Sequence, residues 1–208
     1  TPLLKKSELV KQTNDFSFQI LKEINKQETE KPNVVLCPLS ISFALGMTMN
    51  GAAGETYSQI KEILHLSNYS DTDINDIFYH ILINYPALDN KVQLKIANSI
   101  WYDETFLILE PFKTTNENKF LASVYMRDFT NPATLDDINQ WVENNTFGLI
   151  KNMLDQISQG SRLYLINTVY FKGNWTYQFE EKNTIQKDFH ITSSESVECS
   201  FMRQKNEL

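Results

Sequence analysis

The chain has 208 residues, of which 41% are hydrophobic and 22% charged, and its formal net charge at pH 7 is -7. These values are ordinary for a soluble globular protein and leave room for one large domain. The acidic balance argues against nucleic acid and against an anionic membrane as partners, because both require clustered Lys and Arg. No apolar run approaches the roughly 18 residues that span a bilayer. We therefore expect neither nucleic-acid binding nor membrane insertion.

The cysteines of the chain are Cys37 and Cys199, too few for a disulfide framework and unlike any zinc-binding spacing. We expect two free thiols in packed positions, no metal and no cofactor. The thiols themselves leave the cellular compartment open. Our expectation is an extracellular or cell-surface location rather than a cytoplasmic one.

Apolar residues recur every three or four positions through much of the first half of the chain, which indicates helices. The first helix is expected to begin near Asn14 or Asp15, because both are good N-terminal caps. A helix that Ser40 caps is apolar on every side and must therefore be buried. The other elements expected in this half are a short buried strand at 33–36, a helix capped by Thr56 and a helix at 72–84.

Strands and helices mix in the second half without a regular βαβ alternation. Strands are expected at 92–102, 123–129, 162–172, 187–192 and 196–203. Helices are expected at 111–121, at 134–147 with Thr134 and Asp137 in a capping box, and around 150–154. This order predicts an α+β fold in which helices pack around large mixed or antiparallel sheets.

The strand predicted at 162–172 has two largely apolar faces, so we expect it at the centre of a sheet and covered on both sides. Asn167 interrupts one of those faces. A buried amide without partners costs about 1–3 kcal/mol, so Asn167 should join a polar network. Two readings stay open: a purely structural network, or a polar lock, meaning hydrogen bonds that hold elements together where strands must separate.

Two segments carry a family resemblance: NVVLCPLSISFALGMTMNGAAGET at 33–56 and LYLINTVYFKGNW at 163–175. They resemble the serpin signatures that precede the first buried helix and that form the third strand of the main sheet. The segments NDFSFQIL, ANSIWYDETFLI and INQWVENNTFGLI also resemble serpin elements, in the same order. The chain is identified as the N-terminal part of a single serpin domain over 1–208, incomplete without a C-terminal segment. Its source stays open, a bacterial one included.

The resemblance implies a suicide-substrate inhibitor of serine proteases, trypsin-like or subtilisin-like, with papain-like cysteine proteases as a further target class. A protease cleaves an exposed reactive loop, which then inserts as an extra strand into the main sheet. Such an inhibitor is not an enzyme and has no catalytic residue, and its reactive-site bond lies outside this chain. The alternative is a non-inhibitory serpin that acts as a carrier, chaperone or storage protein. An enzyme with Cys37 as nucleophile is a third and much weaker hypothesis, because no oxyanion-type glycine loop adjoins it.

The resemblance also assigns the residues of a conformational switch. Ser40 and Asn167 match the region called the shutter, beneath the point where the main sheet opens. Trp175 matches the breach, near the top of the sheet where the loop begins to insert. Cys37 departs from the pattern, because many serpins have Ser there and a thiol is the weaker hydrogen-bond partner.

Two expectations about partners follow. The protein's own C-terminal fragment should supply the strands and the shutter histidine that this chain lacks. Some serpins bind heparin through basic residues on the helix that corresponds to 72–84. That stretch contains no Lys or Arg here, so we expect no heparin site on it.

Overall fold

The computed structural model describes residues 2–27 and 34–205, with side chains from Lys11 onward within those ranges. The chain divides into two compact units, Thr1–Phe171 and Lys172–Leu208. Within the described residues, no helix has both the length and the apolar character needed to cross a membrane. The first unit holds the sheet and most of the helices, and it is described first.

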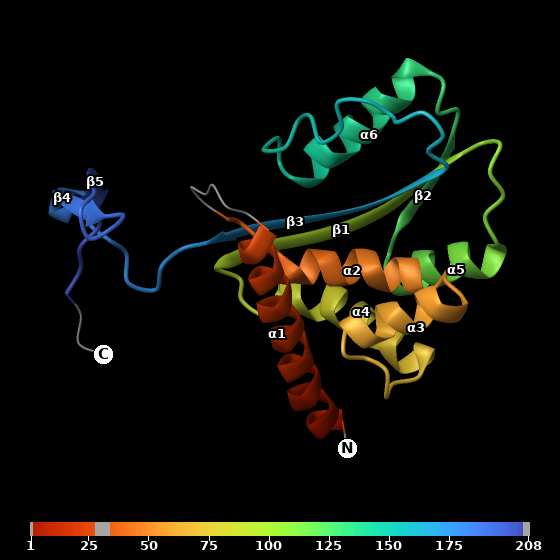
Figure 1. Cartoon of the computed structure of the whole chain (residues 1–208), viewed down its shortest axis with the longest axis horizontal. Coiled ribbons are helices and arrows are strands. Elements are labelled where there is room, and N and C mark those ends of the chain that lie inside the picture. The colour runs from red at the N-terminus through yellow and green to blue at the C-terminus, as the bar shows by residue number, and fades with distance from the viewer. Residues whose placement is uncertain (1, 28–33, 206–208) are drawn as a thin grey trace. The chain divides into compact units, whose positions relative to one another are not determined.

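The described residues of the first unit contain six α-helices, a short 3-10 helix and three strands, and β3 runs two residues beyond the unit. In chain order they are α1 (Pro2–Gln27), α2 (Pro38–Met49), α3 (Gly54–Ile63), α4 (Asp71–Asn84), η1 (Tyr85–Ala87), β1 (Val92–Asp103), α5 (Glu110–Lys119), β2 (Ser123–Arg127), α6 (Pro132–Asn145) and β3 (Leu163–Gly173). The strands form one sheet in the order β2-β1-β3, with β1 and β2 parallel. The sheet lies between α6 on one face and a layer containing α2 and α4 on the other (Figure 1). The expected α+β fold is confirmed.

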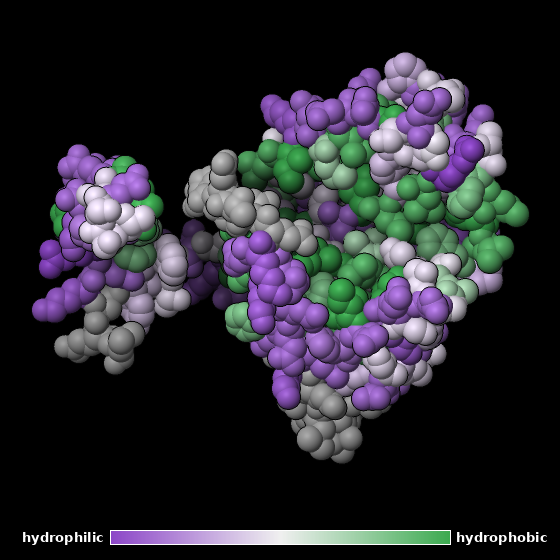
Figure 2. All heavy atoms as spheres, in the orientation of Figure 1, coloured by the Kyte–Doolittle hydropathy of each residue, from purple (hydrophilic) through white to green (hydrophobic). Residues whose placement is uncertain are grey.

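Each face of the sheet has its own apolar cluster. On the α2 face, Ile100 of β1 and Leu165 of β3 pack with the aromatic and aliphatic residues of α1 to α4. On the α6 face, Trp101 and Ile166 pack against Ile138 and Val142 of α6. Figure 2 shows apolar residues gathered between α6 and the helices of the other layer, whereas the outer sides of α1 and α6 are hydrophilic.

Several expected helix starts are wrong. The first helix begins at Pro2, because helix-forming residues precede the two caps that we expected. The expected cap residues Ser40, Thr56 and Thr134 all lie inside helices that begin earlier. For α2 and α6 the reason is a proline, since Pro38 and Pro132 stand at the first helical position, where a missing N–H costs nothing.

Three further expectations about elements are wrong. No strand forms over 34–36, where Val35 is 98% exposed, and residue 33 lies outside the described residues. The stretch around 150–154 is not helical. It is a loop whose backbone groups at 153 and 154 form hydrogen bonds with the side chain of Asn139 in α6. The strand expected at the sheet centre, β3, lies at the edge of the described sheet. Two apolar faces show that a strand is covered, but they do not show which strand lies beside it.

The second unit contains a two-stranded antiparallel hairpin of β4 (Ile185–His190) and β5 (Ser196–Phe201), preceded by the 3-10 turn η2 (Glu181–Asn183). Both strands were expected from the sequence, with slightly different limits. Residues directly opposite each other share a face of such a pair. The register therefore places Ile185, Phe189, Val197, Cys199 and Phe201 together on one face. The opposite face carries polar residues only.

Candidate functional site

Ser40 and Asn167 lie in direct contact although 127 positions separate them. Ser40 stands in the first turn of α2, and its hydroxyl donates a hydrogen bond to Oδ1 of Asn167 in the middle of β3. Asn167 alternates with Leu163 and Leu165, which pack into the cluster on the α2 face. An amide that interrupts an apolar face needs a polar partner, and Ser40 provides one.

A third polar residue, Asn98 of β1, completes the network. The side-chain nitrogen of Asn167 donates to Oδ1 of Asn98 at 2.7 Å, and also approaches the carbonyl oxygen of Ala97 at 3.5 Å. The side-chain nitrogen of Asn98 in turn donates to the carbonyl oxygen of Phe120 at 2.7 Å. We call Ser40, Asn167, Asn98 and the Phe120 carbonyl the amide relay. It connects α2, two adjacent strands and the end of α5.

The Phe120 carbonyl needs such a partner because of its place in the chain. Phe120 follows the last residue of α5, and the last carbonyls of a helix have no partner within the helix. Phe120 is fully buried and Asn98 is 2% exposed, so water does not replace the missing bond. Asn98 therefore satisfies a backbone group that would otherwise stay unpaired in the core.

Sequence reasoning missed Asn98, although its signal was present. Asn98 lies between Ile96 and Ile100 in the alternation of β1, which is the pattern that singled out Asn167 in β3. Ile96 and Ile100 both belong to the cluster on the α2 face. Examining every predicted strand for a polar residue on its apolar face would have found both amides.

Aromatic packing makes the surroundings of the relay apolar. Phe43 of α2, Phe78 of α4 and Phe120 form a trio with ring centroids 5.0 to 6.2 Å apart. A Cβ on Gly46 would lie 2.7 Å from the Phe78 ring, so this glycine lets α2 approach the trio closely. Hydrogen bonds in such a low-dielectric environment are strong, and unpaired groups there are costly.

The other two expected site residues do not join the relay. Cys37 immediately precedes α2 and is an exposed free thiol, so the expectation of a packed position is wrong for it. Its carbonyl accepts from the N–H of Ile41 at 3.3 Å, and no hydrogen bond of its thiol is recorded with any described residue. Trp175 belongs to the second unit, is 64% exposed and packs edge to face on Phe179 at 5.5 Å.

The opposite face of the sheet is fastened differently. Trp101 stacks on Tyr125 with centroids 4.2 Å apart, and the Arg127 guanidinium lies over both rings. Arg127 also pairs with Asp137 of α6 at 2.9 Å, which links β2 to that helix. Asn139 of α6 accepts from the N–H groups of residues 153 and 154 and donates to the carbonyl of 154, at 2.8 to 3.0 Å.

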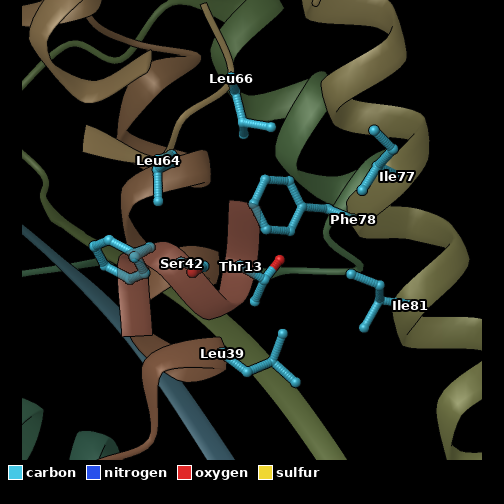
Figure 3. Close-up of a pocket in the computed structure, with 9 residues that line it drawn as sticks. Thr13, Leu39, Ser42, Leu64, Leu66, Ile77, Phe78 and Ile81 are labelled. Atoms are coloured by element: carbon cyan, nitrogen blue, oxygen red, sulfur yellow. The ribbon is translucent and has the colours of Figure 1, made fainter. Parts of the chain in front are cut away.

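A small pocket lies among α1, α2, α4 and the turn after α3 (Figure 3). Phe78 and Ile81 of α4, Leu64 and Leu66 line it together with Phe16 of α1. Its volume of about 30 Å³ is enough for about two water molecules. It is therefore too small for a ligand much larger than water. Among the described residues no group of three or more His, Cys, Asp or Glu side chains is arranged to hold a metal ion.

The sequence and the fold both match a known protein family. A sequence model of the family described as serpin (serine protease inhibitor) matches residues 11–208. The chain belongs to the serpin family. The family description is of protease inhibitors and not of enzymes, so Cys37 has no support as a nucleophile.

Particular relatives sharpen this assignment. A serpin of Bos taurus is 32% identical over 197 residues, which are 93% of this chain and 47% of that protein. Cleaved kallistatin complexed with heparin superposes with a TM-score of 0.86 at 26% identity, over 94% of this chain and 58% of the other. Human thyroxine binding globulin with a cleaved reactive loop superposes with a TM-score of 0.86 at 25% identity, over 98% of this chain and 60% of the other. The chain thus spans about half the length of the curated relatives that it matches.

Proposed function

We propose that the protein containing this chain is a suicide-substrate inhibitor of serine proteases, trypsin-like or subtilisin-like. Papain-like cysteine proteases are a further target class. The cleaved reactive loop inserts as an extra strand into the main sheet, next to β3. The observation that carries the proposal is the combination of an edge strand with two apolar faces and a buried amide relay beneath it.

The edge of β3 supports insertion on physical grounds. β3 pairs with β1 on one side, and no described strand lies along its other side. An unpaired edge presents a row of N–H and C=O groups that a further strand can satisfy. Both faces of β3 pack against other layers, so a strand added there would also be covered above and below.

The expected switch residues take their roles from this mechanism. In the proposal, Ser40 and Asn167 form the lock that holds β3 on α2 until the sheet opens. Trp175 lies where the loop begins to insert. Cys37 stands where many serpins have a serine. Because its thiol is exposed and outside the relay, Ser40 supplies the hydroxyl of the lock.

The proposal also names the other partners. Since the chain spans about half the length of its curated relatives, we infer that a C-terminal part of the same protein supplies further strands, the shutter histidine and the reactive loop. An extracellular or cell-surface location follows from the target proteases. α4 contains no Lys or Arg, so heparin is not expected to bind there.

A non-inhibitory serpin is the alternative, and one relative favours it. Human thyroxine binding globulin is a carrier by its name, yet it shares this fold closely. Fold alone does not separate the two functions, because both rest on the same packing.

The test mixes the full-length protein with a trypsin-like and a subtilisin-like serine protease and analyses the products on denaturing gels. Inhibition predicts a covalent complex that survives SDS. A protease whose active-site serine is blocked is the matched control, because it cannot form the acyl bond and should give no complex. Cleavage of the loop without any complex would support the carrier alternative. Heparin should not accelerate complex formation through α4.

A further inference from the structure

The last member of the amide relay determines the direction of all its hydrogen bonds. A backbone carbonyl only accepts, so the side-chain nitrogen of Asn98 must face Phe120. The oxygen of Asn98 is thereby turned toward Asn167, whose side-chain nitrogen donates to it at 2.7 Å. The oxygen of Asn167 is then left for Ser40, whose hydroxyl donates. The orientation at α2 is thus set by the Phe120 carbonyl through Asn98, with the Ala97 carbonyl at 3.5 Å as a more distant second acceptor for Asn167.

Reversing this order is costly at every step. Rotating the Asn98 amide by half a turn would set its oxygen against the Phe120 carbonyl and its nitrogen against the nitrogen of Asn167. Asn98 is 2% exposed and Phe120 fully buried, so water cannot repair either mismatch. One orientation is therefore retained. Ser40 cannot impose it, because a hydroxyl both donates and accepts.

We propose that Asn98 is a positioning residue for the contact between Ser40 and Asn167. It fixes the Asn167 amide with its oxygen toward α2, and so sets how firmly β3 is held on α2. This inference rests on the proposed function, in which β3 moves relative to α2 as a strand is inserted. Asn98 is 2% exposed and therefore acts through Asn167 rather than by contact with the protease.

The relay separates into a part that stays together and a part that breaks. Asn98 and Asn167 stand on neighbouring strands, and Phe120 lies just before β2, so these members belong to the sheet and its lead-in. Ser40 belongs to α2. Sliding of β3 over α2 therefore requires the loss of the Ser40–Asn167 bond, which is the one relay bond that α2 itself makes. Without Asn98, the Asn167 nitrogen would retain only its 3.5 Å approach to the Ala97 carbonyl, so the amide could rotate and weaken that bond while Ser40 remains unchanged.

The experiment is a double-mutant cycle between Ser40 and Asn98, for which no mutual contact is recorded. The full-length protein carries Ser40→Ala, Asn98→Leu or both, and the rate at which its sheet takes up a peptide with the sequence of its own reactive loop is measured. Each single change should accelerate uptake about fivefold to tenfold. The double variant should be no faster than Ser40→Ala, because Asn98 acts through the bond already lost. Acceleration by the product of the two single effects would overturn the proposal.

Asn75→Leu is the matched control. Asn75 is also a buried amide, and it forms a reciprocal pair with Asn50 at 3.0 and 3.1 Å. Its substitution should lower stability without affecting the orientation of Asn167, because neither member of this pair is bonded to the relay. Its effect on uptake should therefore combine multiplicatively with that of Ser40→Ala.

A second measurement does not depend on an Asn98 variant that folds. Exchange of the side-chain amide protons of Asn167 is followed by NMR in the wild-type protein and in Ser40→Ala. Asn98 should keep these protons protected in both, with rates within about twofold. Loss of protection in Ser40→Ala would mean that Ser40 orients Asn167, which contradicts the inference. If no variant takes up peptide or forms a protease complex, the proposed function fails, and amide exchange still decides the role of Asn98.

Discussion

The two faces of the sheet are held by opposite means. On the α6 face, an aromatic stack fills the centre and the polar contacts lie around it, from Arg127 to Asp137 and from Asn139 to the loop before β3. On the α2 face, aliphatic and aromatic residues surround a polar centre, the amide relay. Within the described part of the chain, Ser40 to Asn167 is the one side-chain hydrogen bond recorded between α2 and the sheet.

This difference indicates which layer β3 can leave. Apolar side chains slide over one another without a directional penalty, because burial depends on area rather than on orientation. A directional contact has to be broken before such movement begins. The α2 face has one such contact at its centre, whereas α6 is tied to the sheet and to the loop by several. Strand insertion beside β3 is therefore expected to move the sheet together with α6, over α2.

The substitution expected to separate the two faces most strongly is Trp101→Ala, which removes the central side chain of the α6 face. Trp101 is 2% exposed, and its truncation should cost about 3–5 kcal/mol of the free energy of unfolding of the full-length protein. Hydrogen exchange should rise first in α6 and the loop after it, because both rest on this residue. Phe43→Ala is the control on the other face; it should cost a similar amount but loosen α2 and α4. Equal loosening of both layers by Trp101→Ala would contradict the comparison.

Asn139→Ala should have the next largest effect, a loss of about 2 kcal/mol. It removes the acceptor of two backbone N–H groups and the donor to one carbonyl, all in the loop before β3. Amide exchange at Met153 and Leu154 reports the change directly. Asn139→Asp is the matched control, because it retains the acceptor and loses the donor only. The stability of Asn139→Asp should fall between those of the wild-type protein and the alanine variant. Equal loss of stability in both variants would mean that the bond from Asn139 to the Leu154 carbonyl accounts for the whole effect.

The sequence predicted the strands better than the way they are fastened. Alternating apolar residues mark one face of β1 and both faces of β3, so the strand positions and the two-sided covering of β3 could be read directly. Asn167 stood out because it interrupts such a pattern. The resemblance to serpins supplied its partner, Ser40, which no local pattern connects to it across 127 positions.

Other features left no signal that periodicity can detect. Asn139 lies among the polar residues of α6, and its partners are backbone groups, which every residue possesses. The helix starts at Pro38 and Pro132 were missed because good capping residues stood nearby. The edge position of β3 depends on which strands pair, and pairing is a tertiary property that burial patterns do not encode.

Acid should weaken the turn regions at the end of β1 and after β2. The hydroxyl of Thr105 and the N–H of Phe129 donate to Asp103 and lower its pKa, and the hydroxyl and N–H of Thr130 do the same for Asp128. A pKa lowered by folding contributes stability above the ordinary value of 3.8, and this contribution is lost as the pH falls through the lower folded value. The free energy of unfolding should therefore decline below about pH 4.

Asp103→Asn tests this dependence. The variant should be less stable than the wild-type protein at neutral pH, and the difference should shrink toward pH 3 when denaturant midpoints are compared. Asp136→Asn is the control, because it changes an exposed carboxylate of α6. It should change the denaturant midpoint little at any pH. A difference between wild type and Asp103→Asn that stays constant down to pH 3 would remove the carboxylate as the cause.

The smallest expected effect has the opposite sign and concerns the residue next to Asn167. Thr168 points to the α6 face, is 5% exposed, and its hydroxyl has no hydrogen-bond partner among the described residues. Valine has nearly the same shape without the unpaired hydroxyl, so Thr168→Val should raise the free energy of unfolding by up to about 1 kcal/mol. Thr134→Val is the matched control, because the buried Thr134 hydroxyl donates to the carbonyl of Asp128 at 2.6 Å, and its loss should lower stability. Equal destabilisation by both would mean that the Thr168 hydroxyl is bonded in solution. A gain in stability from Thr168→Val would show that the α6 face of β3 needs no buried polar group to hold the strand, whereas the neighbouring Asn167 is hydrogen-bonded on the α2 face.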